Sequence, residues 1–459
     1  MKIRIYSLLL CGFALGSLSA LAQQSPLLEK YRTMALDYNH DLKAAEKNIA
    51  ASMEVEKSAR ADLKPKLSGT ANFQYTENPL ELTLDVPSLG LSRTVEGKQL
   101  NYGGSLSILQ PVYTGGRVLE SIRMAQHQQS FAANQAKALN DAVCYQTDIQ
   151  YWSAVARQEI VTVAEDFRNS IAALVKTIKE RVEVGLVDPQ DLLMAEVKLN
   201  EAEYQLLQAQ SNFETGRMAL NSMIGVRLEH HTELDSQIPV VVVDDSTWLS
   251  TGMARPEIQM AYDRIRMAES TKKLNDSQFK PQFYVGIDGS YSSPGYNFKK
   301  DLDPNYAVYA KVSVPIFEWG KRKSEKRASS FRVGMAEDNL NKVMDQVELE
   351  IGVARKALSQ AMERVRLSES SLAKAEENEA KAIERYNEGK VSVVEVIDAQ
   401  TYRQTSQVNY VQAKAAAQGH YSELIKAPPA YALYKTGSWR VMIWILKRSR
   451  LRPKTIRRT

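Results

Sequence analysis

The sequence predicts an α+β protein built as an internal duplication, with two β-strands and one long α-helical hairpin in each copy. The first observation is the repeat itself: Pro111 to Arg117 (PVYTGGR) recurs 204 residues later as Pro315 to Lys321 (PIFEWGK). The second is an alternation of apolar and polar residues with period two, and the third is a helical period near 3.6 over very long segments. A repeat of this extent dictates the architecture.

Residues 1–22 have the pattern of a secretory signal peptide, in which Lys2 and Arg4 precede an apolar run that ends in small residues. The mature chain is therefore expected to be exported. Cys144 is then its only thiol, which excludes a framework of intramolecular disulfides. No later apolar run has the length of a membrane-spanning helix, so a span would have to be built from strands.

The charge of the chain is unevenly distributed. Residues 428–459 contain nine Lys and Arg and no acid, and the rest of the mature chain carries 48 basic and 54 acidic residues, a net charge of −6. This mildly acidic body does not support nucleic-acid binding. We expect a first repeat over 23–225, a linker over 226–256, a second repeat over 257–427 and a basic tail of unassigned role over 428–459.

Each copy has two segments in which apolar and polar residues alternate strictly, as in a strand with two different faces. The predicted strands cover about 66–76, 100–111, 282–292 and 305–315. Such strands suit a lipid-facing barrel with a wet lumen, and a soluble sheet packed on one face alternates in the same way. The connection at 77–99 is longer than its counterpart at 293–304, which predicts an exposed loop.

A long helix follows the second strand of each copy. From Arg117 to Val184 there is no proline, and apolar residues recur every three or four positions with the period of a straight helix. A helix of that length extends roughly 100 Å, which a small globule cannot contain. Arg322 to Glu388 repeats the pattern in the second copy.

Each long helix is predicted to end at a hairpin tip, near 185–189 in the first copy and near 389–393 in the second. Gly185 and Gly389 fit the left-handed position just beyond a helix end, where a residue without a Cβ is favoured. A return helix should follow each tip.

Three acidic residues just past the tips admit two interpretations. Asp191 and Glu395 stand third in the return helices, where an acid satisfies backbone amides and the helix dipole. Asp398 is not at a capping position, and it lies three residues from Glu395 on nearly the same helical face. Because a capping acid can also face a pore, both roles stay open.

The sequence offers no site for catalysis or for a metal ion. None of the five histidines has a ligand spacing with a Cys or carboxylate on one helical face. No nucleophile elbow, phosphate loop or paired-carboxylate motif is visible. We therefore expect no enzymatic activity, no cofactor and no metal.

The duplicated strand and hairpin units, the Pro-aromatic strand exits and the segment Tyr386 to Ala399 (YNEGKVSVVEVIDA) resemble the TolC-type outer-membrane efflux protein family, over roughly residues 26–427. The resemblance implies a homotrimer whose subunits each give four strands to a 12-stranded β-barrel, with a periplasmic α-helical tunnel. Four strands cannot close a barrel alone, which agrees with a trimer. It also implies a passive exit duct in the outer membrane, for a tripartite efflux or type I secretion system.

By position, the resemblance assigns both tips to the docking of a periplasmic adaptor protein, through Gly185, Leu186, Val187, Gly389, Lys390 and Val391. It assigns Glu395 and Asp398, with Asp191, to a gated acidic aperture at the periplasmic end. Val391 stands where family members carry a basic residue, and Lys390 is adjacent.

The implied partners are two further copies of the chain, the adaptor, an inner-membrane pump and outer-membrane lipid, and no nucleic acid. The alternative function is that of a soluble periplasmic adaptor or coiled-coil scaffold, because such proteins also use long helical hairpins.

Overall fold

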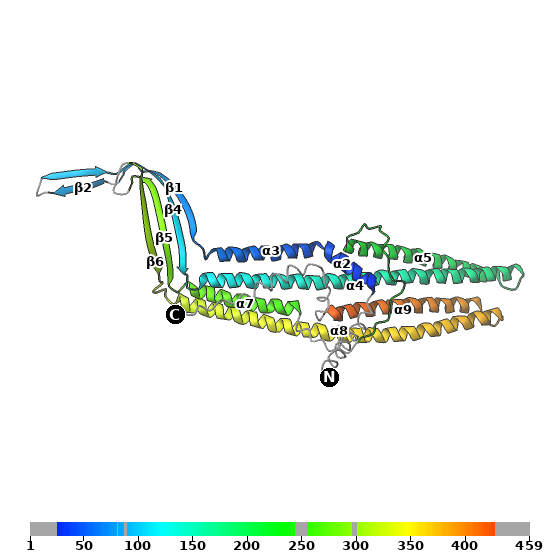
Figure 1. The fold of residues 1–459 in the computed structure, drawn as a ribbon. Coiled ribbons are helices and arrows are strands. Elements are labelled where there is room, and N and C mark those ends of the chain that lie inside the picture. The colour runs from blue at the N-terminus through cyan, green and yellow to red at the C-terminus, as the bar shows by residue number, and fades with distance from the viewer. Residues whose placement is uncertain (1–24, 80, 87–89, 244–254, 296–300, 427–459) are drawn as a thin grey trace, which may run out of the picture. The chain divides into compact units, whose positions relative to one another are not determined.

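The computed structural model describes residues 25–79, 81–86, 90–243, 255–295 and 301–426 (Figure 1). The predicted signal peptide and the basic tail lie outside these residues. The chain divides into two compact units, of which one, formed by 45–134 and 259–342, carries all the described strands. The other unit carries both hairpin tips. No helix in the described ranges is both long and apolar enough to cross a membrane.

The strand-bearing unit contains a four-stranded antiparallel sheet (Figure 1). The strands are β1 (Lys66–Tyr75), β4 (Leu100–Tyr113), β5 (Gln282–Ser293) and β6 (Asp303–Ser313), and their order is β1-β4-β5-β6. The two copies are therefore joined through the pairing of β4 with β5. Strands β1 and β6 form the edges of this sheet, and an edge strand presents backbone groups to which another strand can pair.

The sheet has one polar and one apolar face, as the period-two alternation predicted. Thr70 is paired with Ser105, and their hydroxyl oxygens are 2.7 Å apart. On the same face the hydroxyl of Ser107 donates to the carboxylate of Asp288 on β5. On the opposite face Ile108 stands between a leucine of β1 and an isoleucine of β5.

The connection between the first two strands contains a second sheet, so the prediction of a loop was wrong there. Strands β2 (Glu81–Val86) and β3 (Leu91–Glu96) pair in antiparallel register, and the hydroxyls of Thr83 and Thr94 are 3.1 Å apart. Each strand has six residues. Over so short a run, period-two alternation is a weak signal.

Two long hairpins follow the strands. The first consists of α4 (Arg117–Glu183) and α5 (Pro189–Ile224), and the second of α8 (Lys321–Asn387) and α9 (Val393–Lys426) (Figure 1). The predicted helical period is confirmed, because most of the apolar positions that recur every three or four residues are buried. In α4 they include Trp152, Val163, Phe167, Ile171 and Ile178, and in α8 Val347, Ile351, Leu358 and Val365.

One further helix stands directly before the first strand of each copy, and the sequence patterns did not predict either helix. They are α3 (His40–Ala61) and α7 (Pro256–Ser277). Both have 22 residues, and they begin 216 positions apart. The duplication therefore also includes the helix that precedes the first strand of each copy.

The N-terminal helix α2 (Pro26–Tyr38) is held on α4 by a buried ion pair. The guanidinium of Arg32 donates to both carboxylate oxygens of Asp148, at 2.6 and 2.7 Å. The two side chains are 5% and 0% exposed. Ser25 caps the helix by accepting a hydrogen bond from the amide of Leu27 at 3.1 Å.

Residues 226–243 form neither helix nor strand and lie against the return helices. The side-chain amide of Asn221, in α5, donates to the carbonyls of Leu228 and His230, both at 2.8 Å. The side-chain amide of Gln418, in α9, donates to the carbonyl of Pro239 at 2.8 Å. Hydrogen bonds to helix side chains thus satisfy part of the backbone of this segment.

Candidate functional site

The two hairpin tips close with the same backbone geometry. Gly185 and Gly389 both have a φ of 72°, so the prediction of left-handed glycines is confirmed. In each tip the glycine amide donates to the carbonyl three residues earlier, and the next amide donates to the carbonyl five residues earlier, at 2.9 to 3.0 Å. This pair of bonds is the Schellman motif, which satisfies carbonyls left free at a helix end.

The first return helix begins with a side-chain cap. The carboxylate of Asp188 accepts a hydrogen bond from the amide of Gln190 at 2.8 Å, and Pro189 occupies the first turn. The carboxylate of Asp191 has no hydrogen-bond partner among the described residues. Asp188 therefore performs the capping for which Asp191 was also a candidate.

The two tips pack on each other through one apolar cluster that all four hairpin helices supply. Its buried members are Leu174, Ile178, Ala195, Tyr386, Val393 and Val396. Val187 and Val391 are partly buried and pack against this cluster. Leu186, by contrast, is 76% exposed, and Lys390 is exposed and pairs with its neighbour Glu388 at 2.7 Å. The six predicted docking residues therefore include two that stabilise the packing of the tips.

Arg181 connects the first tip to the second. Its guanidinium lies over the ring of Tyr386, 4.7 Å from the centroid. It donates to the carbonyl of Tyr386 at 3.3 Å and to the side-chain oxygen of Asn387 at 3.0 Å. Arg385, the equivalent of Arg181 in the second copy, is exposed. The repeat of this arginine in both copies was the available signal, and sequence reasoning did not assign it a role.

Glu395 and Asp398 are both exposed near the start of α9, where buried Val393, Val396 and Ala399 hold the helix. Neither carboxylate has an ion pair or hydrogen bond with a described residue. The structure thus presents two unpaired carboxylates on α9 beside the joined tips. Within the described residues, no three His, Cys, Asp or Glu side chains are grouped so that they could hold a metal ion.

Polar contacts further along α9 tie it to both long helices. The guanidinium of Arg403 is 2.6 Å from the carboxylate of Glu379 on α8, and the side-chain amide of Gln400 donates to the hydroxyl of Ser170 on α4 at 2.8 Å. Burial raises the pKa of Glu379, although the charge of Arg403 acts in the opposite direction. These residues have no sequence motif, and sequence reasoning missed them.

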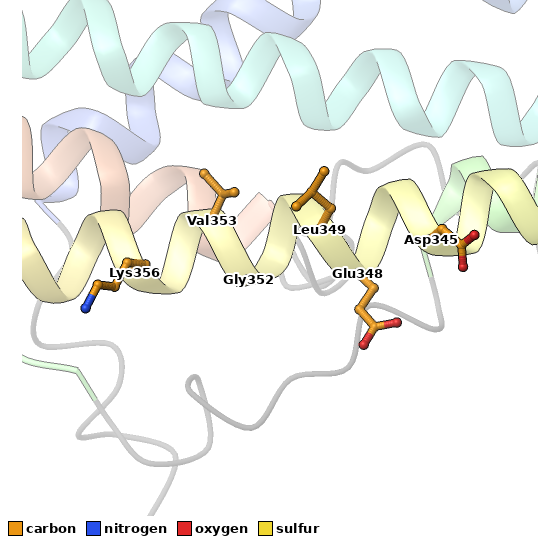
Figure 2. A pocket seen from close by; sticks show the side chains of 6 residues that line it. All are labelled: Asp345, Glu348, Leu349, Gly352, Val353 and Lys356. Atoms are coloured by element: carbon orange, nitrogen blue, oxygen red, sulfur yellow. The ribbon is translucent and has the colours of Figure 1, made fainter.

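A shallow hollow lies on one helix of the same unit. Figure 2 shows its six lining residues following one another along α8, from Asp345 to Lys356. Its floor is Gly352, and the flanking Leu349 and Val353 are 67% and 56% exposed. Because a single helix supplies every lining residue, this is an apolar helix face bordered by charges and not an enclosed ligand cavity.

Comparison with known proteins by sequence finds outer membrane efflux proteins. A family model described as "Outer membrane efflux protein" matches residues 32–226 and 253–427. The outer membrane efflux protein BepC of Brucella suis biovar 1 (strain 1330) is 21% identical over 412 residues, which cover 89% of this chain and 86% of BepC.

Solved structures share the fold. The outer membrane protein VceC of Vibrio cholerae superposes with a TM-score of 0.73 at 16% identity, covering 88% of this chain and 97% of VceC. The Campylobacter jejuni CmeC outer membrane channel superposes with a TM-score of 0.70 at 18% identity, covering 88% of this chain and 85% of CmeC.

Proposed function

We propose that this chain, which belongs to the outer membrane efflux protein family, is the passive exit duct of a tripartite efflux or type I secretion system. It is an outer-membrane protein, and we assign its helical hairpins to the periplasmic side. The family match includes both copies of the repeat. It therefore disfavours the alternative of a soluble periplasmic adaptor or scaffold.

Three chains together would form the duct. A four-stranded sheet with two open edges is not tolerated in lipid, and pairing of β1 with β6 of a neighbouring copy removes both edges. The polar face with Thr70, Ser105 and Asp288 would line the lumen, and the apolar face would contact lipid. The exposed face of α8 around Leu349 and Val353 suits burial against a neighbouring copy.

We assign the periplasmic aperture to the acidic residues just past the tips. Three copies of Glu395 and Asp398 would place six carboxylates around the axis, and Asp191 would add three more. An acidic ring of this kind raises the local cation concentration and favours cation passage. The observation that carries this assignment is the pair of exposed, unpaired carboxylates beside the cluster that joins the tips.

We assign docking of a periplasmic adaptor to the exposed residues of the tips, chiefly Gly185, Leu186, Gly389 and Lys390. We assign the supply of energy to an inner-membrane pump, since a passive duct needs an energy source outside itself. Opening would separate the two tips, which the apolar cluster and Arg181 hold together.

Conductance of the purified protein in planar bilayers tests the aperture. The double variant Glu395→Ala with Asp398→Ala should lose most of its preference for cations over anions and should be blocked less by divalent cations. A matched control removes Glu196 and Glu201, two exposed acids of α5. Unchanged ion selectivity in the aperture variant, or an equal loss in the control, would contradict the assignment.

A further inference from the structure

The segment that joins β6 to α8 presents a group of large apolar side chains to solvent. Ile316 is 94% exposed, Phe317 70% and Trp319 90%. The rings of Phe317 and Trp319 lie edge to face, with centroids 4.9 Å apart. The indole of Trp319 suits the boundary between lipid and water, because its ring is apolar and its N–H can form a hydrogen bond with water, and aromatic girdles flank the apolar band of outer-membrane barrels.

The first copy has no such aromatic residue at the position of Trp319. Its equivalent is Gly115, with a φ of 66°, and Trp319 adopts the same left-handed region with a φ of 48°. A Cβ on Gly115 would lie 2.6 Å from the carbonyl oxygen of Ser277, so that site admits only glycine. The second copy thus carries a tryptophan, Trp319, at a position where the backbone conformation favours glycine.

Basic residues follow the aromatic pair directly. Lys321, Lys323, Lys326 and Arg327, in the first two turns of α8, are exposed. With exposed Lys273 of α7 they make up what we call the basic cluster. None of these five side chains has a carboxylate partner among the described residues, whereas the nearby Lys280 and Arg322 share Asp276.

The first copy has apolar residues at some positions of the basic cluster and basic residues at others. Val118, Leu119 and Ile122 are the equivalents of Arg322, Lys323 and Lys326. Val118 and Ile122 are buried, at 8% and 7% exposed, whereas Leu119 is 56% exposed. The fold of the repeat therefore does not require a base at the positions of Lys323 and Lys326, whereas Arg117 and Arg123 are the basic equivalents of Lys321 and Arg327.

A hollow between α7 and α8 adjoins the basic cluster. It is lined by Lys272, Lys273, Lys280 and Lys326, together with Glu269, Asp276 and Val333. The ammonium of Lys272 donates to the hydroxyl of Ser330 at 2.9 Å, and Asp276 is occupied by its two basic partners. Four lysines against two acids give the lining a net positive charge, which favours an anion.

We propose that this junction, with its aromatic pair and its basic cluster, binds the headgroups of anionic glycerophospholipids in the periplasmic leaflet of the outer membrane. The inference rests on the proposed function, which places the helix-bearing ends of the strands at that leaflet. Phe317 and Trp319 would enter the boundary between acyl chains and headgroups. The lysines would bind headgroup phosphates, since each Lys or Arg near an anionic membrane surface adds to the attraction. Each subunit of the trimer would hold one such site.

Lipid retention by the full-length trimer provides the test. Wild-type protein is equilibrated in detergent with either phosphatidylglycerol or phosphatidylcholine, separated by gel filtration, and assayed for bound lipid by mass spectrometry. We expect preferential retention of phosphatidylglycerol. The variant with Lys321, Lys323, Lys326 and Arg327 changed to Gln should retain on the order of tenfold less.

A matched control changes four other exposed bases of α8, Lys342, Lys356, Arg364 and Lys374, to Gln. Retention in the control should equal that of the wild type. Equal retention by the junction variant, equal retention of phosphatidylcholine by the wild type, or displacement of the lipid by millimolar inorganic phosphate would overturn the proposal. Loss of the trimer in the junction variant would instead assign the cluster to contacts between subunits.

Fluorescence of Trp319 gives a second measurement. In bilayers that contain brominated phospholipid, the emission difference between wild type and Trp319→Phe should be strongly quenched, and an unquenched difference would count against burial of this ring in the membrane boundary. Channel conductance is recorded for every variant. Normal conductance without lipid preference refutes the lipid site alone, whereas absent conductance in the wild type refutes the duct itself.

Discussion

Replacement of Arg181 by alanine should loosen the junction between the two hairpin tips. The side chain makes two charge-assisted hydrogen bonds to the second tip, at 3.3 and 3.0 Å, and lies over the ring of Tyr386. Such a hydrogen bond contributes about 1.5–3 kcal/mol net and an exposed cation–π contact about 0.5–1 kcal/mol. Arg181 is only partly buried and water replaces some of these contacts, so we expect a loss of about 2 kcal/mol per subunit.

A loss of about 2 kcal/mol raises the population of separated tips roughly 30-fold. Two measurements detect this change: faster hydrogen exchange of the amides of Gly185, Leu186, Gly389 and Lys390, and more frequent openings of single channels in planar bilayers. Exchange should accelerate by a similar factor where it is limited by local opening.

Arg385→Ala is the matched control for this experiment. The backbone carbonyl of Arg385 accepts the same tip hydrogen bond as that of Arg181, and its side chain is exposed. The control should therefore exchange and conduct like the wild type. If Arg181→Ala were indistinguishable from Arg385→Ala in both measurements, the contact between the tips would have no role in holding the aperture closed.

Four further outcomes are expected. Arg32→Ala should lower the free energy of unfolding by about 3–5 kcal/mol, because it removes the cation that pairs with the fully buried carboxylate of Asp148; chemical denaturation followed by circular dichroism measures this, and a loss below 1 kcal/mol would contradict it. Leu358→Ala should cost about 2–5 kcal/mol in the same assay, since the side chain is fully buried. Burial raises the pKa of the Cys144 thiol from 9.0 to about 12, so alkylation at pH 8 should be roughly 10³-fold slower in the folded protein and should accelerate about tenfold per pH unit; rapid labelling seen by mass spectrometry would show that the thiol is accessible. Gly389→Trp should abolish export in cells while the trimer yield stays normal, and surviving export would argue against adaptor docking at that tip.

The long helices and their tips were predictable because their signals are local. The period near 3.6 selected positions such as Phe167 and Leu358 that are buried, and the tip glycines stand where a helix must end in the left-handed region. The contacts of Arg181 were not predictable, since they join residues 205 and 206 positions apart and depend on how two hairpins pack.

Other elements escaped prediction for different reasons. The strands β2 and β3 are too short to produce a clear period. The helices α3 and α7 are polar, with α3 mostly exposed and α7 mostly half-buried, and they begin 216 residues apart in the repeat. The candidate acids Glu395 and Asp398 were identified by their position just past the tip, and the resemblance implied their role at the aperture. Only the structure reveals that both are exposed and have no partner among the described residues.

The left-handed backbone of the tip glycines determines which replacement residues the tips accept. A Cβ added to Gly185 or Gly389 would meet no atom within 4 Å, and the backbone of each has a φ of 72°. Handedness and not volume therefore restricts these positions. An L-alanine is strained there, whereas a D-alanine introduced by semisynthesis fits the same backbone and reduces the conformational freedom of the unfolded chain. A mirror-image residue at the tip would thus stiffen the turn and leave its outline almost unchanged for whatever binds it.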